Sequence, residues 1–425
     1  MKVRIEKIVY PGKSLAYYNN KVVFLDEGLP QEEVEIKILK EKKNFSEAQV
    51  LKIISKSVYR KNPLCKHFKI CSKFQYIEYT QQLKIKEFFL KETSQRIFKR
   101  ELNASKILAS PLEFRYRNKG IFSVIYEKNT PFLAYHIPNT FKEFIKIDEC
   151  YLFSERANKI LKETLNKTQI YNLKSIKNIE VRESFSQKNI LINIYLKDKK
   201  EFDAINKLNI NAENVLLSLT HPKLNPPQIL EYKVLKGKDF IEEKILNFYF
   251  RVSISSFFQI NTFLLTELLS DIIKYSELTG KEKIADFYCG VGALSIPISK
   301  KAYKIFGIES EYSAIRDLKY NLIKNSVYNY TIAEGKVEDF CDYILNKGID
   351  LLILDPPRTG LTNKVLKSIL KFLPKRIFYI ACDLATLSRD LKVLDSHYKI
   401  KDIFLYDFFA QTPYVESFVI LERKV

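Results

Sequence analysis

Two residues near the C-terminus have side chains that could perform covalent chemistry. Cys382 ends the apolar run of IACDLATLSRDL, residues 380–391, just before a segment with helical spacing. A helix N-terminus lowers the pKa of a nearby thiol, so this position favours a nucleophilic thiolate. Polar neighbours such as Asp383 and Thr386 argue against the alternative, a cysteine in an apolar core. Glu416 lies in the otherwise apolar run of YVESFVILER, where a carboxylate is either paired on an exposed face or functional.

A glycine-containing turn upstream is typical of a cofactor site. In DFYCGVGALSIPIS an apolar strand runs through Gly290 and Gly292 into a helix, and such glycines let a ligand approach the backbone. Asp286 would stand at the end of this strand. Glu309 ends the next strand, 23 residues later, where an acid can accept hydrogen bonds from ribose hydroxyls. A dinucleotide fingerprint needs a third glycine, which is Ser295 here, so a methyl donor is favoured over a nicotinamide cofactor or a structural turn.

A third motif, LDPPRTGL, follows a later apolar run and places Asp355 at another strand end. Its two prolines stiffen the loop and remove backbone donors, although a plain strand-to-helix turn is the alternative. Arg358 stands where amino-group methyltransferases carry an aromatic residue, and the loop lacks the nearby cysteine of cytosine-5 RNA methyltransferases. The motif therefore argues against both of those chemistries.

Charge is distributed unevenly along the 425 residues, whose net charge is +20. Residues 1–240 carry 45 Lys and Arg against 27 Asp and Glu, whereas residues 241–425 carry 25 against 23. A basic half joined to a nearly neutral half suggests polyanion binding in the first and chemistry in the second. The alternative is a general bias towards Lys, but such a bias would not spare the C-terminal half.

Cysteine usage and the absence of targeting signals indicate a cytoplasmic protein. The sequence has no signal-peptide pattern and lacks the roughly 20-residue apolar run of a membrane span. A disulfide framework is therefore not expected, and metal binding or catalysis is the expectation for any functional cysteine. The six cysteines are Cys65, Cys71, Cys150, Cys289, Cys341 and Cys382.

The elements that position these residues predict an α/β chain in three parts. Residues 1–57 alternate like short strands, which predicts a five-stranded β-barrel of oligonucleotide-binding type. Residues 58–245 predict a central mixed α+β RNA-binding domain, with a helix at 76–107 that we expect to pack on the catalytic domain. In residues 246–425, apolar runs alternate with helical segments and end in a hairpin, which predicts a Rossmann-like parallel sheet.

Together these motifs resemble the uracil-5 RNA methyltransferase family, over essentially the whole chain. The N-terminal barrel is similar to the family's TRAM domain, which binds RNA. Single motifs are weakly specific, but several in the family's order are highly specific. Those that match are YTQQLKIK, YRNKGIFSV, SSFFQINT, DFYCGVGALS, GIES, LDPPRTGL, ACDLATLSRDL and QTPYVES.

The resemblance implies a role for each matching position. Cys382 would be the nucleophile that adds to C6 of uracil, and Glu416 the base that removes the C5 proton. The target base must leave its stack to reach the pocket. The residues implied to bind S-adenosylmethionine are Gln259, Tyr288, Glu309 and Asp355.

The family often carries a four-cysteine iron–sulfur cluster, and this chain departs from that pattern. Cys65 and Cys71 keep the first interval and Cys150 matches a later ligand, but Phe74 stands at the third position. Three thiolates fall short of the usual four, so we favour loss of the cluster over an unusual fourth ligand such as His67.

Two further departures lie beside the implied catalytic residues. The family usually has Asn-Pro after the nucleophile, where this chain has Asp383 and Leu384. It often has histidines before the base, where this chain has Pro413 and Tyr414. Activity is still expected, because the nucleophile and the base are retained.

The substrate is predicted to be structured RNA. The barrel resembles the rRNA-type enzymes, so 23S rRNA is favoured and tRNA is the alternative. A catalytically inactive RNA-binding or chaperone protein is the alternative of another class. We expect a monomer with no membrane partner.

Overall fold

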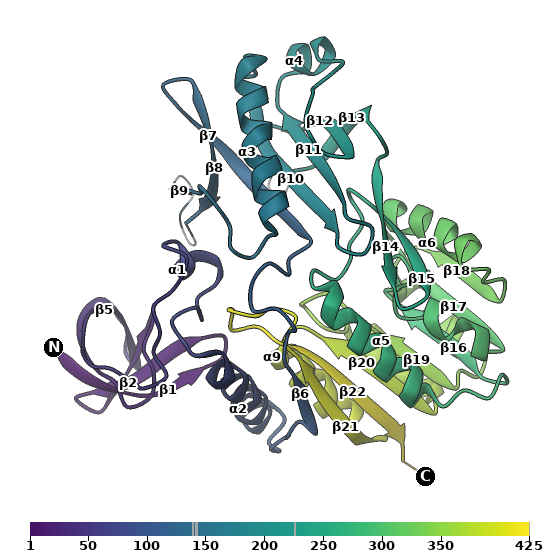
Figure 1. Cartoon of the computed structure of the whole chain (residues 1–425). Coiled ribbons are helices and arrows are strands. Elements are labelled where there is room, and N and C mark those ends of the chain that lie inside the picture. The colour runs from purple at the N-terminus through teal and green to yellow at the C-terminus, as the bar shows by residue number, and fades with distance from the viewer. Residues whose placement is uncertain (138–139, 141–142, 225–226, 425) are drawn as a thin grey trace. The chain divides into compact units, whose positions relative to one another are not determined.

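The computed structural model describes residues 1–137, 140, 143–224 and 227–424 (Figure 1). The chain divides into two compact units. Unit 1 comprises Met1–Glu113, Pro356–Leu366 and Phe378–Val425. Unit 2 comprises Phe114–Asp355 and Lys367–Ile377. Among the described residues, no helix is both long and apolar enough to span a membrane.

Unit 1 begins with a closed five-stranded barrel in the order β1-β2-β3-β5-β4. Alternate residues of the strands point inwards and form its apolar core, as the period of two requires. The core comprises Val3, Ile5, Ala16, Val23, Leu25, Val34, Ile36, Ala48 and Val50. The strands are β1 (Lys2–Val9), β2 (Lys13–Tyr18), β3 (Lys21–Leu25), β4 (Glu33–Glu41) and β5 (Phe45–Ser55). The barrel predicted from the sequence is confirmed.

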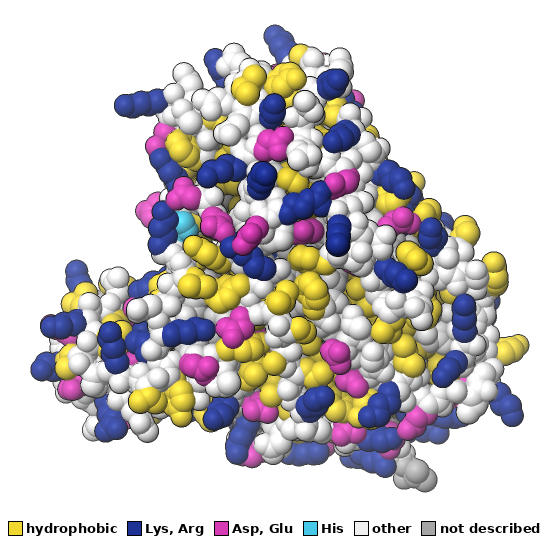
Figure 2. All heavy atoms as spheres, in the orientation of Figure 1, with side chains coloured by type: hydrophobic (Ala, Val, Ile, Leu, Met, Phe, Trp, Pro, Cys, Tyr) yellow, Lys and Arg dark blue, Asp and Glu magenta, His cyan; other side chains and the backbone are white. Residues whose placement is uncertain are grey.

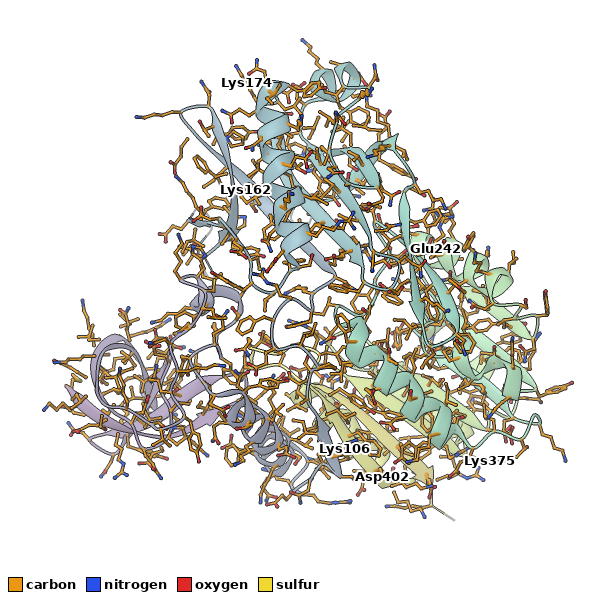
Figure 3. The ribbon with its side chains drawn as sticks, in the orientation of Figure 1. Lys106, Lys162, Lys174, Glu242, Lys375 and Asp402 are labelled. Carbon is orange, nitrogen blue, oxygen red and sulfur yellow. The ribbon has the colours of Figure 1, made fainter. Side chains whose placement is uncertain are left out.

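The rest of unit 1 combines helices with the end of a sheet in the order β20-β22-β21-β6. β21 and β22 form the predicted antiparallel hairpin. Figure 3 labels Lys106 on β6 and Asp402 on β21, two strands that pair in parallel. The elements are α1 (Phe68–Cys71), α2 (Tyr79–Ile97), β6 (Lys106–Leu108), β20 (Arg376–Ala381), α9 (Leu384–Leu394), β21 (Tyr398–Tyr406) and β22 (Glu416–Arg423).

Helix α2 is shorter than the helix predicted over 76–107. It ends at Ile97 because Lys99 adopts a left-handed φ of +63°, which breaks the helical path. The chain then continues into β6, whose residues the predicted helix wrongly included. Within unit 1, α2 packs against α9, the helix after Cys382.

Unit 2 contains a seven-stranded sheet in the order β13-β12-β11-β10-β7-β8-β9, with α3 packed against β8 and β10 (Figure 1). A separate hairpin, β14–β15, comes next along the chain. The strands are β7 (Lys119–Glu127), β8 (Thr130–His136), β9 (Phe144–Lys146), β10 (Ile176–Ser184), β11 (Asn189–Leu196), β12 (Asn214–Thr220), β13 (Ile229–Lys236), β14 (Phe240–Ile245) and β15 (Phe248–Ser253). The helices are α3 (Glu155–Ile170) and α4 (Lys199–Ala204).

The remainder of unit 2 is a parallel sheet in the order β18-β17-β16-β19. β16 lies between β17 and β19, so the strand order reverses there, and such a reversal is where open α/β sheets bind ligands. The strands are β16 (Lys283–Phe287), β17 (Lys304–Glu309), β18 (Tyr330–Glu334) and β19 (Leu351–Leu354). The helices are α5 (Thr262–Ser276), η1 (Ile296–Lys301), α6 (Tyr312–Lys324), α7 (Val337–Leu345) and α8 (Asn363–Phe372), of which residues 363–366 belong to unit 1. The predicted α/β fold class is confirmed, whereas the domain boundaries at residues 57 and 245 stay a prediction.

Candidate active site

The candidate cofactor site lies in unit 2, in the turn after β16. Tyr288 and Gly290 both adopt positive φ, +64° and +54°, which turns the chain sharply after the strand. Gly292, at φ +85°, fits tightly, since a Cβ there would lie 2.6 Å from Leu318. The carboxylate of Glu309 holds the turn by accepting a hydrogen bond from the Gly290 amide at 2.9 Å. The sequence therefore folds the turn around a carboxylate from the neighbouring strand.

Asp286 is the most unusual residue near this turn. It is fully buried, and neither carboxylate oxygen has a hydrogen-bond partner among the described residues. Burial, with smaller contributions from the negative charges of Asp355 and Glu309, raises the pKa of Asp286 to about 7, although the nearby hydroxyls of Ser295 and Tyr330 act in the opposite direction. Desolvation likewise raises the pKa of Asp355, which comes directly after β19, the strand beside β16. Three carboxyl groups at adjacent strand ends suit a ligand that carries positive charge and hydroxyl donors.

S-adenosylmethionine, which the fold implies, fits this set of groups. Its sulfonium and ammonium are cations, its ribose hydroxyls are donors, and Asp286 offers two acceptor oxygens that the described residues leave unused. Of the residues that the sequence assigned to the donor, Tyr288, Glu309 and Asp355 lie at these strand ends. Their contact with the donor stays a proposal.

Gln259, the fourth assigned residue, lies in the segment between β15 and α5 and is buried. Asn118 fixes this segment by donating its side-chain amide to the Gln259 carbonyl at 2.9 Å and its backbone N–H to Ile260 at 3.0 Å. The buried Arg182 donates to the Ser256 carbonyl at 2.8 Å. The segment that carries Gln259 is thus held by two residues of the central part of unit 2.

The hairpin before this segment is held by α6. Asp317 of α6 accepts hydrogen bonds from the Ser253 amide at 2.6 Å and from the Ser256 hydroxyl at 2.7 Å. Glu242 of β14, labelled in Figure 3, accepts from Tyr320 of α6 at 3.1 Å. These hydrogen bonds hold the β14–β15 hairpin and the residues that follow it against α6, and thereby position the start of the segment that carries Gln259.

The candidate nucleophile lies in unit 1, where β20 ends. Cys382 comes directly after the last residue of β20, is partly exposed, and directly precedes the Asp383 cap of α9. The Asp383 carboxylate accepts from the Thr386 amide at 2.8 Å, which closes the first turn of α9. Cys382 therefore stands at the N-terminus of an 11-residue helix, as predicted, where a negative charge is favoured.

Glu416 is the first residue of β22 and is only 2% exposed. The next residue, Ser417, donates its hydroxyl to the carbonyl of Ala381 at 2.8 Å. Ala381 directly precedes Cys382. This hydrogen bond therefore links the strand of the predicted base, Glu416, to the backbone next to the predicted nucleophile, Cys382. The structure thus brings the two residues to neighbouring strand ends within one unit.

The loop before Glu416 is fixed by a buried polar network from α2. The Gln82 side chain donates to Gln411 Oε1 at 3.0 Å and accepts from the Gln411 amide at 3.1 Å. Lys86 forms a buried ion pair with Asp407, which also accepts from Tyr79 at 2.9 Å. Because all these groups are buried, removing one would leave a partner without its hydrogen bond.

The loop Pro356–Leu361 is fixed by α9. Asp390 accepts from the Leu361 amide at 2.8 Å, and a Cβ on Gly360 would lie 2.7 Å from the same carboxylate. Arg358 is exposed, and its guanidinium lies over the ring of Tyr414 at 5.0 Å. Tyr414 is one of the departures from the family pattern, and its ring gives Arg358 a partner by a cation–π contact.

The cluster positions do not fit a four-thiolate cluster. Phe74 is fully buried, its ring lies 6.3 Å from that of Phe89, and its amide donates to Gln411 at 3.0 Å. Within the described ranges, no group of three or more His, Cys, Asp or Glu side chains is arranged to hold a metal ion. Because Phe74 supplies no thiolate, no catalytic step is assigned to a cluster, and the loss of the cluster stays a prediction.

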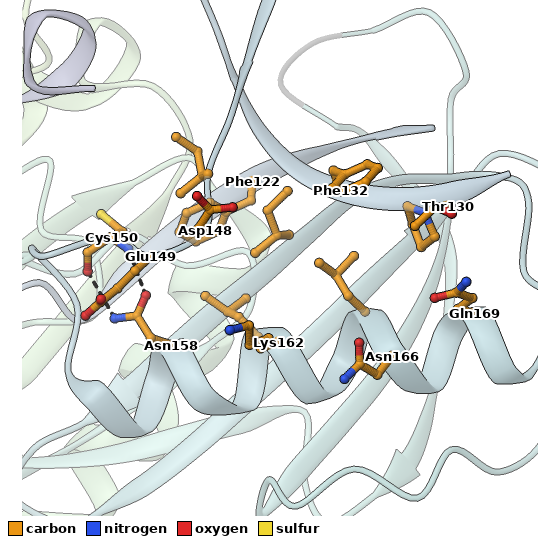
Figure 4. A pocket seen from close by; sticks show the side chains of 15 residues that line it. Phe122, Thr130, Phe132, Asp148, Glu149, Cys150, Asn158, Lys162, Asn166 and Gln169 are labelled. Atoms are coloured by element: carbon orange, nitrogen blue, oxygen red, sulfur yellow. Dashed lines mark hydrogen bonds between the residues drawn. The ribbon is translucent and has the colours of Figure 1, made fainter. Parts of the chain in front are cut away.

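Cys150 lines a cavity of about 230 Å³ against α3 in unit 2 (Figure 4). Asn158 of α3 accepts from the Cys150 amide at 2.8 Å, and burial raises the pKa of the Cys150 thiol. None of the residues assigned to the methyl donor lines this cavity.

Sequence reasoning assigned no role to several residues that hold the site. Gln82 and Lys86 lie in YTQQLKIK, and Asn118 lies in YRNKGIFSV. Both segments are similar to family segments, and that similarity could have pointed to a role for these residues. Arg182 lies outside these segments, and its partners Ile254 and Ser256 are more than 70 residues away along the chain.

The parallel sheet, its glycine turn and the acids at its strand ends define a methyltransferase. A family model of tRNA (uracil-5-)-methyltransferases matches residues 78–424, and a TRAM domain model matches residues 1–51. The chain therefore belongs to the S-adenosylmethionine-dependent uracil-5 RNA methyltransferase family and carries an N-terminal TRAM domain. The predicted family and enzyme class are confirmed.

Relatives match along almost the whole chain. An RNA methyltransferase of Clostridium tetani, described as uncharacterized, is 33% identical over 430 residues, with 96% of this chain and 93% of the relative covered. One of Aquifex aeolicus, described in the same way, is 32% identical over 431 residues, with 100% and 99% covered. The Pyrococcus abyssi tRNA (uracil-54, C5)-methyltransferase, solved with S-adenosyl-L-homocysteine, shares the fold with a TM-score of 0.78, 22% identity and 99% of each chain covered.

Proposed function

We propose that this enzyme methylates C5 of a uridine in structured RNA, with Cys382 as nucleophile and Glu416 as base. The observation that carries the proposal is the hydrogen bond from the Ser417 hydroxyl to the Ala381 carbonyl. Ser417 directly follows the buried Glu416, and Ala381 directly precedes Cys382 at the N-terminus of α9. A thiol and a carboxylate at neighbouring strand ends are the two groups that C5 methylation of uracil needs.

The chemistry requires both groups because C5 of uracil is too weakly nucleophilic to be methylated unaided. The Cys382 thiolate adds to C6, so that a C6–S bond forms and electron density moves to C5. S-adenosylmethionine supplies the methyl group. Glu416 then takes the proton from C5, the C5–C6 double bond re-forms, and the C6–S bond breaks to release the thiolate.

We further propose that Gln259, Tyr288, Glu309 and Asp355 bind the methyl donor. Asp286 adds to that set, because its buried carboxylate has acceptor capacity that the described residues do not use. Apart from Gln259, these residues lie at the strand ends around the reversal of strand order, the usual ligand position in open α/β sheets.

The substrate we favour is 23S rRNA. Figure 2 shows Lys and Arg side chains spread over the visible faces of the barrel and the central sheet, which suits a polyanion. The barrel resembles that of rRNA-type enzymes. tRNA is the second candidate, because the archaeal enzyme named for tRNA uracil-54 matches this chain over 99% of its length, the barrel region included. Possession of a barrel therefore does not by itself select rRNA.

The test offers the enzyme unmodified 23S rRNA and unmodified tRNA with labelled S-adenosylmethionine, followed by nucleoside analysis. We expect 5-methyluridine in the rRNA, and none with Cys382→Ala. 5-Methyluridine in tRNA alone would select the second candidate. Tight RNA binding with no methyl transfer to either RNA would overturn the proposal in favour of a non-catalytic RNA-binding protein.

A further inference from the structure

We propose that the barrel turn Tyr10–Gly12 is a positioning element for catalysis, which holds the segment of Cys382 and the segment of Glu416 in their reactive arrangement. The inference rests on the roles proposed for those two residues under the proposed function. It gives the TRAM barrel a second task besides contacting RNA.

The first contact of the turn is made by Tyr10, which lies between β1 and β2. Its hydroxyl donates to Oδ2 of Asp383 at 2.8 Å, across 373 positions of sequence. Its ring lies edge-on to Phe89 of α2, with the centroids 5.7 Å apart. Burial, together with the hydrogen bond to Asp383, raises the pKa of Tyr10 well above its ordinary value, so the hydroxyl remains a donor.

This contact fixes the residue directly after the nucleophile. Asp383 uses one carboxylate oxygen to cap α9 through Thr386 and the other to accept from Tyr10. With both oxygens engaged, the side chain is held in one orientation, and so is the backbone next to Cys382. Tyr10 therefore restrains the chain directly after the predicted nucleophile from a distant part of the sequence.

The second contact is made by Gly12, which has a φ of +94°. A Cβ added to Gly12 would lie 2.7 Å from Cβ and 3.0 Å from Cγ of Pro413, so the backbone of the turn packs directly on that proline. Pro413 is three residues before Glu416. The same turn therefore touches both catalytic segments.

Both contacts fall beside the predicted catalytic residues. Tyr10 bonds Asp383, the residue directly after Cys382, and Gly12 packs on Pro413, three residues before Glu416. One turn thus restrains the backbone next to both groups. RNA binding by the barrel alone gives no reason for these contacts.

The test compares Tyr10→Phe with wild type and with Tyr17→Phe, a matched change at a 55% exposed tyrosine of the same barrel. Tyr10→Phe removes one hydroxyl and keeps the ring on Phe89. We expect kcat per folded enzyme to fall about tenfold, with the KM values for RNA and methyl donor unchanged, because small misplacements of reacting groups have effects of this order or larger. Tyr17→Phe should leave kcat unchanged.

The rate of adduct formation with 5-fluorouridine RNA separates the possible failures. No adduct with wild type would sink the proposed function, and this inference with it. A wild-type adduct with an equal rate and kcat in Tyr10→Phe would overturn the inference and leave the proposed function standing. A higher KM for RNA at unchanged kcat would also overturn it, since Tyr10 would then be an RNA contact.

Discussion

The carboxyl ends of β16 and β20 are the same kind of place in a sheet, and each has a cysteine just beyond it, yet their chemistry is opposite. After β16, Cys289 is buried beside Asp286 and Glu309, and burial with these negative charges raises the pKa of its thiol well above the ordinary value. After β20, Cys382 is partly exposed at the N-terminus of α9. One strand end suits a bound cation and the other a thiolate.

The difference arises from the path of the chain after each strand. The chain leaves β16 through three residues with positive φ, Tyr288, Gly290 and Gly292, and then forms only a short 3-10 helix. No long α-helix therefore begins there to place its positive N-terminal end beside the carboxyl groups. The chain leaves β20 directly into an 11-residue α-helix. A cysteine at a strand end is therefore not enough to predict a nucleophile, because the element that follows decides whether a helix N-terminus stands beside the thiol.

The largest expected effect separates the two cysteines. Cys382→Ala should lower kcat for methyl transfer by roughly 10⁴-fold or more, since removing a nucleophile removes the whole covalent route. Cys289→Ala should keep activity within a few-fold. Steady-state methylation by both variants measures this, and equal losses would show that the two strand ends do not differ in their chemistry.

Glu416→Gln comes next and tests the partner of Cys382. We expect a loss of roughly 10²- to 10⁴-fold, the range for a general base, and accumulation of methylated enzyme–RNA adduct because the C5 proton stays in place. Denaturing gel electrophoresis with ordinary uridine RNA detects the adduct. Glu422→Gln on the same strand, where the carboxylate pairs with Lys399, is the control and should turn over normally.

Asp286→Asn should stabilise the enzyme in the absence of its cofactor. The pKa of Asp286 is raised to about 7 in the folded state, so the fold favours the neutral acid and stability is lost as pH rises from about 4 to 7. An uncharged amide escapes this loss. The gain in free energy of unfolding should be near zero at pH 4 and reach up to about 4 kcal/mol at pH 8. Denaturant unfolding at both pH values measures it, and a gain independent of pH would contradict the buried charge.

The smallest expected effect is on affinity for the methyl donor. Because ionised carboxylates attract the sulfonium, binding of S-adenosylmethionine should strengthen about tenfold from pH 6 to pH 8 as Asp286 loses its proton. S-adenosylhomocysteine, which lacks the sulfonium charge, should change less. Calorimetric titration of both ligands measures this. An equal pH dependence for the two ligands would place the cationic group away from these carboxylates.

Local patterns were sufficient for the barrel, the parallel sheet, the hairpin and the position of Cys382 at a strand end, whereas Glu416 was expected within its strand and is the first residue of β22. They were insufficient where distant segments meet. The contact of Tyr10 with Asp383 spans 373 positions, and the raised pKa of Asp286 results mainly from burial, with smaller contributions from acids at two other strand ends. The predicted helix over 76–107 was too long because apolar spacing cannot reveal the left-handed turn at Lys99.

The central claim, that Cys382 attacks C6 of uracil, is tested most directly by trapping the adduct. Wild-type enzyme, Cys382→Ala and Cys289→Ala are each incubated with S-adenosylmethionine and RNA in which uridine is replaced by 5-fluorouridine, whose fluorine cannot be removed as a proton. A denaturation-resistant, methylated protein–RNA adduct with wild type and Cys289→Ala, absent with Cys382→Ala, is the predicted result, with the crosslinked peptide containing Cys382. An adduct that persists in Cys382→Ala would contradict it.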